Sequence, residues 1–190
     1  MDPVTFIRES CEIQGATTPE DLIGMTRAYD YAVERSWRFD QNGGIRVQLS
    51  DLSSFICYIR NNPVWVEFRD LPVTLPNCNV IPGGRDEILR QLKNLFAAIK
   101  NLTPTEFYWA FEEIHPWDDG NGRVGTLIFN LLNNTISAPV HPPENPKWRA
   151  DLPAGLLKRS GIHAITMSLP SPEKLQSFLD NGWKPYYLKD

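Results

Sequence analysis

The sequence predicts a mainly α-helical fold that carries one small β-hairpin. Apolar residues recur at helical spacing over several segments, and two of these segments open with a threonine, a proline and an acid in the order that starts helices. Only residues 64–75 alternate β-branched and aromatic side chains as a strand does. The chain has 190 residues, 42% of them hydrophobic, which is enough for one ordinary domain with a real core.

Three helices are expected before residue 60. The first covers about Pro3 to Ile13. The second opens at Thr18-Pro19-Glu20-Asp21, which supplies an N-cap hydroxyl, a proline at the first helical position and acids in the first turn. Its helically spaced apolar residues are Leu22, Met25, Tyr29 and Val33. The third follows Ser50, and its apolar residues are Leu52, Phe55, Ile56 and Ile59.

The expected hairpin, or extended flap, lies between Val64 and Leu75. Its alternation is broken by Asp70 and Pro72, residue types that are uncommon inside strands. Residues 77–84 are expected to form a loop that leads to the next helix.

Three further helical stretches frame a polar segment. A helix from Arg85 has a wide apolar stripe formed by Ile88, Leu89, Leu92, Leu95, Phe96 and Ile99. The next opens with the capping box Thr103-Pro104-Thr105-Glu106 and must break at His115-Pro116, because a proline pushes the preceding residue out of the helical region. A helix then resumes after Gly122, with an apolar face of Val124, Leu127, Ile128, Leu131 and Leu132.

The C-terminal region is expected to differ from these helices. Five prolines between Ala138 and Pro153 predict irregular structure, and Ser171-Pro172-Glu173 predicts the start of a last short helix. We expect a single domain over residues 1–190. Its parts would be N-terminal helices over 1–40, core helices over 85–135 and a C-terminal extension over 138–190.

Composition narrows the class of protein. The net charge is -4 and no block of like charge occurs, which disfavours a dedicated nucleic-acid binder. The three cysteines, Cys11, Cys57 and Cys78, have no metal-ligand spacing and indicate reduced thiols. The first residues lack the features of a signal peptide, and no apolar run is long enough to span a membrane. We therefore expect a cytoplasmic protein, with delivery into another cell left open.

Residues 115–123 read His-Pro-Trp-Asp-Asp-Gly-Asn-Gly-Arg and combine the groups needed to handle a phosphate. Gly120, Asn121 and Gly122 stand at a helix start, where backbone N–H groups and the helix dipole favour an anion. Arg123 adds a permanent positive charge with a fork that suits phosphate oxygens. The segment therefore predicts a phosphate cradle.

Two other residues of the segment predict chemistry at that cradle. Asp119 offers a hard oxygen ligand for a magnesium ion that also holds phosphates. His115 can accept a proton near neutral pH and so activate an attacking hydroxyl. Pro116 and Trp117 are expected to anchor the loop in the core. A lone histidine or a lone Asp-Gly-Asn-Gly turn would usually be structural, but their combination favours a functional site.

This string resembles the signature of the Fic family, HxFx(D/E)GNGRxxR, with Trp117 in place of the phenylalanine. The resemblance implies a helical bundle with a β-hairpin flap, and transfer of AMP from Mg-ATP to a hydroxyl of a target protein. It also implies that His115 is the base, Asp119 the Mg²⁺ ligand, Gly120 to Gly122 the phosphate cradle and Arg123 a phosphate clamp. The target would pair with residues 64–75 as an added strand.

Two positions depart from the family pattern. Thr126 stands where the second signature arginine belongs, so that the nucleotide site lacks one permanent charge. Ser10, Gln14 and Gly15 resemble the family's inhibitory motif (S/T)xxxE(G/N), with Gln14 in place of the glutamate. In the family this glutamate pairs with the second arginine. Losing both partners avoids the cost of leaving one buried charge unpaired.

Several readings remain open at this stage. The donor is ATP bound with reduced affinity, another triphosphate or a diphosphate-linked compound. A phosphotransferase of the same superfamily would carry lysine at Gly122, so the glycine favours nucleotidyl transfer. The alternatives are a degenerate fold that binds a nucleotide or a protein, and transfer to a non-protein acceptor. The target and the oligomeric state do not follow from the sequence.

Overall fold

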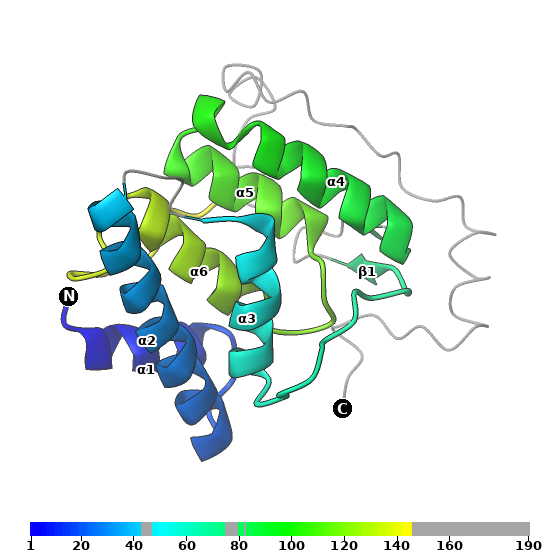
Figure 1. Cartoon of the computed structure of the whole chain (residues 1–190). Coiled ribbons are helices and arrows are strands. Elements are labelled where there is room, and N and C mark those ends of the chain that lie inside the picture. Colours follow the sequence, from blue (N-terminus) through cyan, green and yellow to red (C-terminus); the bar gives the residue numbers. More distant parts are fainter. Residues whose placement is uncertain (43–46, 75–79, 82, 146–190) are drawn as a thin grey trace. The chain divides into compact units, whose positions relative to one another are not determined.

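The computed structural model describes residues 1–42, 47–74, 80–81 and 83–145. Helices dominate these residues, as expected (Figure 1). The α-helices are α1 (Pro3–Ile13), α2 (Pro19–Asn42), α3 (Leu49–Ile59), α4 (Arg85–Ala97), α5 (Pro104–Ile114) and α6 (Asn121–Leu132). A 3-10 helix covers Ile99–Asn101, and two short strands are β1 (Val73–Thr74) and β2 (Val80–Ile81). None of the helices described here is long and apolar enough to cross a membrane.

The chain divides into two compact units, which are described separately. The first contains residues 1–68 and 86–143 and therefore almost all of the helices. The second contains residues 69–85 and 144–190, of which the structure describes 69–74, 80–81, 83–85 and 144–145. The expected helix after Ser171 lies outside the described residues. The expectation of a single domain over 1–190 stays a prediction.

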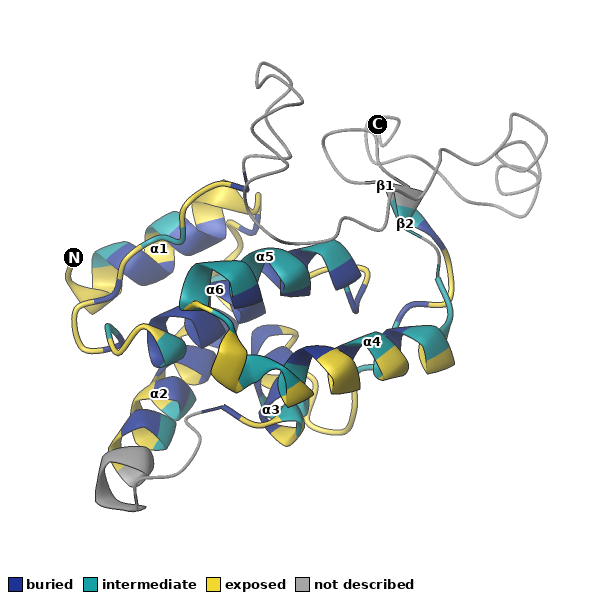
Figure 2. Cartoon of the chain, turned by 90° about the horizontal axis from the view of Figure 1, so that it is seen from above, coloured by how far each residue is buried: buried dark blue, intermediate teal, exposed yellow. Residues whose placement is uncertain are grey.

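Helix α6 is the centre of the first unit. It packs against α1, α2, α3 and α5, and Figure 1 shows it alongside α3 and α5. Every residue from Asn121 to Leu131 is buried, whereas α1 and α4 keep exposed faces (Figure 2). A helix buried on all sides needs no polar stripe. The polar residues at its start must therefore be stabilised by specific hydrogen bonds.

The helix starts follow the capping signals in the sequence. The Thr103 hydroxyl accepts the Glu106 N–H at 3.2 Å, and the Glu106 carboxylate accepts the Thr103 N–H at 2.9 Å. Thr18 and Asp21 exchange the same two bonds at the start of α2, each at 3.2 Å. Both expected helix starts are confirmed. A capping box satisfies two amides that a helix end leaves without partners.

The expected hairpin was placed too early in the chain. β1 and β2 pair antiparallel with Val73 opposite Ile81, so the loop expected over 77–84 contains a strand. Residues 64–72 are not in a strand. Their alternation has another cause, because Val66 and Phe68 pack against the core from an irregular segment. One buried face produces alternation in any extended chain, whether or not a partner strand is present. The role of residues 64–75 as a flap stays a prediction.

Candidate functional site

The polar segment is the loop that joins α5 to α6. His115 caps the end of α5 in the left-handed conformation, with φ 48° and ψ 67°, and its N–H donates to the Phe111 carbonyl at 3.1 Å. Pro116 explains why the helix ends here, since it disfavours a helical residue before it. The half-buried His115 side chain therefore stands at the turn where the chain leaves α5.

Trp117 anchors this loop, as the sequence predicted. Its side chain is 1% exposed and its ring centroid lies 5.8 Å from that of Phe68 and 6.3 Å from that of Phe111. Pro116 is also buried. Burying a large aromatic side chain stabilises by several kcal/mol in order of magnitude, so it holds the loop firmly.

Asn121 has a role that the sequence did not reveal. Its Oδ1 accepts the Trp117 N–H at 3.0 Å, and its Nδ2 donates to the Trp117 carbonyl at 2.7 Å. Its side chain thus closes the loop on itself. The assignment of Asn121 to the phosphate cradle rests on its backbone amide alone.

Gly120 sets the loop close against α3. It adopts φ 91° at the N-cap of α6, and an added Cβ would come within 2.8 Å of the Ile56 Cδ1 atom and 3.3 Å of the Ile59 Cγ2 atom. The position therefore requires glycine for its conformation and for this close approach. Its packing places the end of α3 beside the loop.

The start of α6 presents backbone amides in the manner of an anion site. The first intrahelical bond joins the Val124 N–H to the Gly120 carbonyl at 3.0 Å, so the amides of Asn121, Gly122 and Arg123 precede the helical ladder. Among the described residues, no side chain caps this helix end. Such amides favour a phosphate or carboxylate.

The suggested inhibitory motif reaches this same helix start. A Cβ added at Gly122 would overlap the Gln14 carboxamide, so the Gln14 side chain lies directly against the loop. Ser10 is buried on α1, and Gly15 takes φ 66° just after the helix. The sequence placed Gln14 only by its resemblance to the inhibitory motif. The structure shows that the residue occupies space beside the proposed cradle.

Arg123 is buried and already paired. Its Nη1 lies 3.1 Å from Asp21 Oδ1, and its Nη2 lies 2.9 Å from Asp119 Oδ2, while only 1% of the side chain is exposed. Asp21 is itself bonded to Thr18, and these bonds, together with Arg123, hold the pKa of the Asp21 carboxyl below its usual value, against the effect of burial. The guanidinium therefore lies on the buried side of the loop, where it is paired with both carboxylates.

Asp119 is an exposed carboxylate of the site. Its side chain is 56% exposed, and its Oδ1 accepts the Gly120 N–H at 2.7 Å. The described residues contain no cluster of three potential metal ligands. An exposed carboxylate fits a magnesium ion, which commonly takes its other ligands from phosphates and water.

Thr126 does not leave an open space where the missing arginine would be. It is 7% exposed and its hydroxyl donates to the Gly122 carbonyl at 2.7 Å. Tyr108 lies next to it, and burial, followed by the charge of Glu112, raises the pKa of the Tyr108 hydroxyl against the opposing effect of its hydrogen bond with Thr126. Residue 126 therefore belongs to the packed contact between α5 and α6.

Glu112 is a second buried polar residue at this contact. It is 6% exposed, and burial raises the pKa of its carboxyl to about 8. Its Oε1 has no hydrogen-bond partner within the described part of the chain. A Cβ at Gly125 would lie 2.7 Å from this atom, so α6 passes very close to it. Burial therefore favours the neutral form of this carboxyl.

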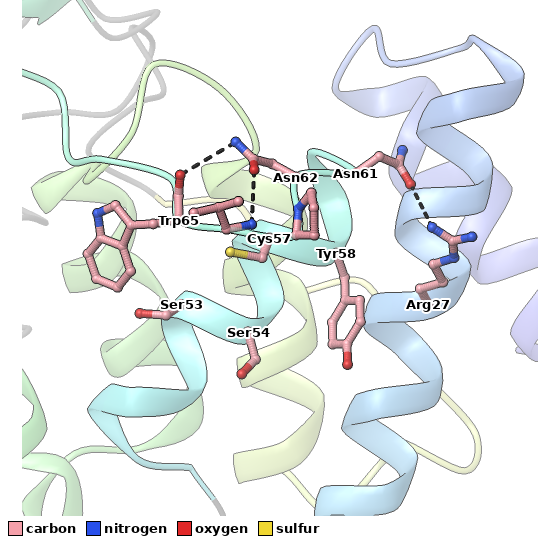
Figure 3. Close-up of a pocket in the computed structure, with 10 residues that line it drawn as sticks. Arg27, Ser53, Ser54, Cys57, Tyr58, Asn61, Asn62 and Trp65 are labelled. Atoms are coloured by element: carbon pink, nitrogen blue, oxygen red, sulfur yellow. Dashed lines mark hydrogen bonds between the residues drawn. The ribbon is translucent and has the colours of Figure 1, made fainter.

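A groove of about 660 Å³ lies on another face of α3 (Figure 3). It is lined by Ser53, Ser54, Cys57 and Tyr58 of α3, by Arg27 of α2 and by residues 61–65. The helix positions of the α3 residues turn away from Ile56 and Ile59, which contact Gly120. The groove is therefore separate from the loop.

Residues 48–133 match the model of the Fic/DOC family. The match spans α3 to α6 and includes the whole loop from His115 to Arg123. It supports a Fic domain over these residues, in agreement with the helical architecture. No match was found among curated proteins. The helices α1 and α2, which carry Gln14 and Asp21, precede the matched Fic region.

Proposed function

We propose that this protein is a Fic-type transferase that moves a nucleotide monophosphate, AMP from Mg-ATP, onto a hydroxyl of a target protein. One observation carries the proposal. The loop closed by Asn121 and Trp117 joins the end of α5, where His115 stands, to the amide-bearing start of α6. A base and an anion site are thus held on one short rigid connection. Such fixed placement is the main contribution a protein makes to phosphoryl-type transfer.

In the proposed reaction the acceptor oxygen attacks the α-phosphorus of the nucleotide. The new bond joins this oxygen to phosphorus, and the bond from phosphorus to the bridging oxygen of the β-phosphate breaks. Pyrophosphate leaves with the bonding electrons, and the acceptor proton passes to the His115 imidazole. The amides at the start of α6 would stabilise the charge on the phosphate oxygens.

Asp119 would hold the magnesium ion, because its carboxylate is exposed beside the helix start. When bound, the ion offsets the negative charge of the phosphates. Arg123 supports this arrangement by fixing the Asp119 carboxylate from the buried side. An extended segment of the target would pair with residues 64–75 as an added strand.

The test is a panel of labelled nucleoside triphosphates incubated with magnesium and a cell lysate, read by gel and by intact mass. Wild-type protein is expected to transfer label from ATP, and His115→Ala is expected to reduce transfer by roughly 100-fold or more, since general-base catalysis contributes that much. Equal labelling by the two proteins would remove His115 from its proposed role. A preference for another nucleotide would correct the donor.

A nucleotide-binding module without transfer is the second candidate. It is favoured by the pairing of Arg123 with two carboxylates and by the uncharged Thr126, since both reduce the positive charge available to a triphosphate. A rise in melting temperature with Mg-ATP, together with no labelled product, would support this candidate.

A further inference from the structure

The loop needs a cation on its solvent side if it is to bind a polyphosphate. Amides alone carry partial charges, and Asp119 brings a negative charge that repels phosphate when no metal is bound. Arg123 cannot fill this need as it stands, because it is 1% exposed and holds two carboxylates. Thr126 is uncharged, and its hydroxyl is bonded to Gly122. The signature residues therefore leave the exposed side without a free positive charge.

Arg60 stands on that exposed side. It is the C-cap of α3, and its Nη1 atom lies 3.8 Å from Asp119 Oδ2. This separation is longer than a hydrogen bond, so the guanidinium faces the carboxylate without being tied to it. The Arg60 side chain is 40% exposed, in contrast to Arg123. A ligand that approaches Asp119 from solvent therefore meets Arg60.

The fold holds Arg60 at this place. Its N–H donates to the Ile56 carbonyl at 2.9 Å, which continues the last turn of α3. Ile56 and Ile59 of the same turn contact Gly120 at the start of α6. The backbone of Arg60 is thereby fixed beside the loop, while its long side chain remains adaptable. An adaptable guanidinium on a fixed backbone suits the binding of a phosphate group.

We propose that Arg60 is a phosphate-binding residue of this site, and that it supplies to the outer phosphates of the nucleotide the positive charge that Thr126 lacks. The inference rests on the proposed function, because it assumes that the start of α6 binds a polyphosphate. It makes Arg60 a specificity residue that distinguishes a triphosphate from a monophosphate. Arg123 remains the buried residue that positions Asp119.

Calorimetric titration with AMP, ADP, ATP and inorganic tripolyphosphate, each with magnesium, tests this role. Arg60→Ala is expected to weaken ATP and tripolyphosphate at least about tenfold, which corresponds to about 1.4 kcal/mol, and to leave AMP within about twofold. Arg60→Lys should retain part of the affinity, because it keeps the charge but loses the fork. Raising the salt concentration should reduce the difference between wild type and Arg60→Ala.

Arg90→Ala is the matched control. Arg90 is an exposed arginine on α4 that also pairs with a carboxylate, Glu87, at 2.6 Å. This variant should bind every probe as the wild type does. Thermal melting of each variant establishes that it is folded before titration.

Three results would overturn the role of Arg60. They are unchanged ATP affinity in Arg60→Ala, an equal loss for AMP and ATP, and no binding of any polyphosphate by the wild type. Label transfer is measured separately. If Arg60→Ala weakens ATP more than AMP but the wild type transfers no label, the transferase is refuted and the role of Arg60 is supported. If the wild type transfers label but Arg60→Ala binds ATP with unchanged affinity, the transferase is supported and the role of Arg60 is refuted.

Discussion

Two polar regions lie close together at the contact between α5 and α6, and they are built differently. In the α5–α6 loop, the Asn121 side chain bonds to the Trp117 backbone and the Asp119 carboxylate accepts the Gly120 N–H. The Arg123 guanidinium donates to the Asp119 carboxylate. Beside the loop, in the contact between the two helices, Glu112 is buried with one oxygen unpartnered in the described part of the chain. Local bonds stabilise the loop, whereas burial at the interface favours the neutral form of a carboxyl. Substitutions should therefore change the pH dependence of stability at the interface and lower stability at every pH in the loop.

The largest effect is expected from pH acting on the interface. The folded pKa of Glu112 is about 8 against 4.5 for an exposed glutamate, so the folded state binds the additional proton between these values. The contribution of Glu112 to stability is complete below pH 4.5 and is lost as the pH rises to about 8. The free energy of unfolding should fall by on the order of 5 kcal/mol over this range.

Glu112→Gln isolates this effect. Denaturant unfolding should be measured from about pH 5 to about pH 9, which covers most of the interval between the unfolded and folded pKa of Glu112. The free energy of unfolding should vary less with pH for the variant than for the wild type. Parallel profiles for the two proteins would mean that Glu112 ionises freely in the folded state and would end the contrast between the regions.

Asn121→Ala should behave differently, with a loss of stability at every pH. The substitution leaves the Trp117 N–H and carbonyl without their partners in a buried loop. Each unpaired buried group costs about 1 to 3 kcal/mol, so a loss of roughly 3 kcal/mol is expected. Urea unfolding at pH 7 provides the measurement. A loss below about 1 kcal/mol would show that the loop is held by Trp117 packing instead.

Gly120→Ala tests the conformation of the loop separately from its hydrogen bonds. A methyl group at φ 91° is strained and would press on Ile56, for which we expect about 1 to 3 kcal/mol of destabilisation. Gly84→Ala, at φ 125° with open space around it, is a matched control for strain without contact. If the two variants lose equal stability, the packing against α3 contributes nothing measurable.

The smallest effect is expected for Asp21→Asn. Its carboxylate has one bond to Arg123, but Asp119 still pairs with that arginine, and Asn can retain the bond to Thr18. We expect a loss of about 1 kcal/mol in thermal unfolding. A loss above about 3 kcal/mol would indicate that Arg123 depends on Asp21 as a buried charge depends on its only partner.

Much of the helical pattern could be predicted from the sequence. The bounds of α1 and the capped starts of α2 and α5 agree with the structure, and so does the break after Ile114. These features depend on residues within one turn of each other, so they can be recognised in a short window. The hairpin was misplaced because alternation reports a buried face and says nothing about a partner strand.

The site shows the same division. The grouping of His115, Asp119 and Arg123 follows from their closeness in sequence, and so does the loop between two helices. The sequence could not predict that Arg123 is buried and that Arg60 is exposed. The partner of Arg123, Asp21, comes from α2, and Arg60 comes from the end of α3. The approach of Gln14 to Gly122 could not be predicted from spacing for the same reason.

The sequence by itself determined the helix starts, the loop and its set of chemical groups, since each depends on short-range bonds and backbone preference. Only the tertiary structure decided that Arg123 lies beneath the loop, that Arg60 faces solvent beside Asp119 and that Glu112 is buried against Gly125. Burial and pairing depend on which helices pack together, and they decide the charge and reach of a side chain. Residues distant in the sequence therefore set the charges available at this site.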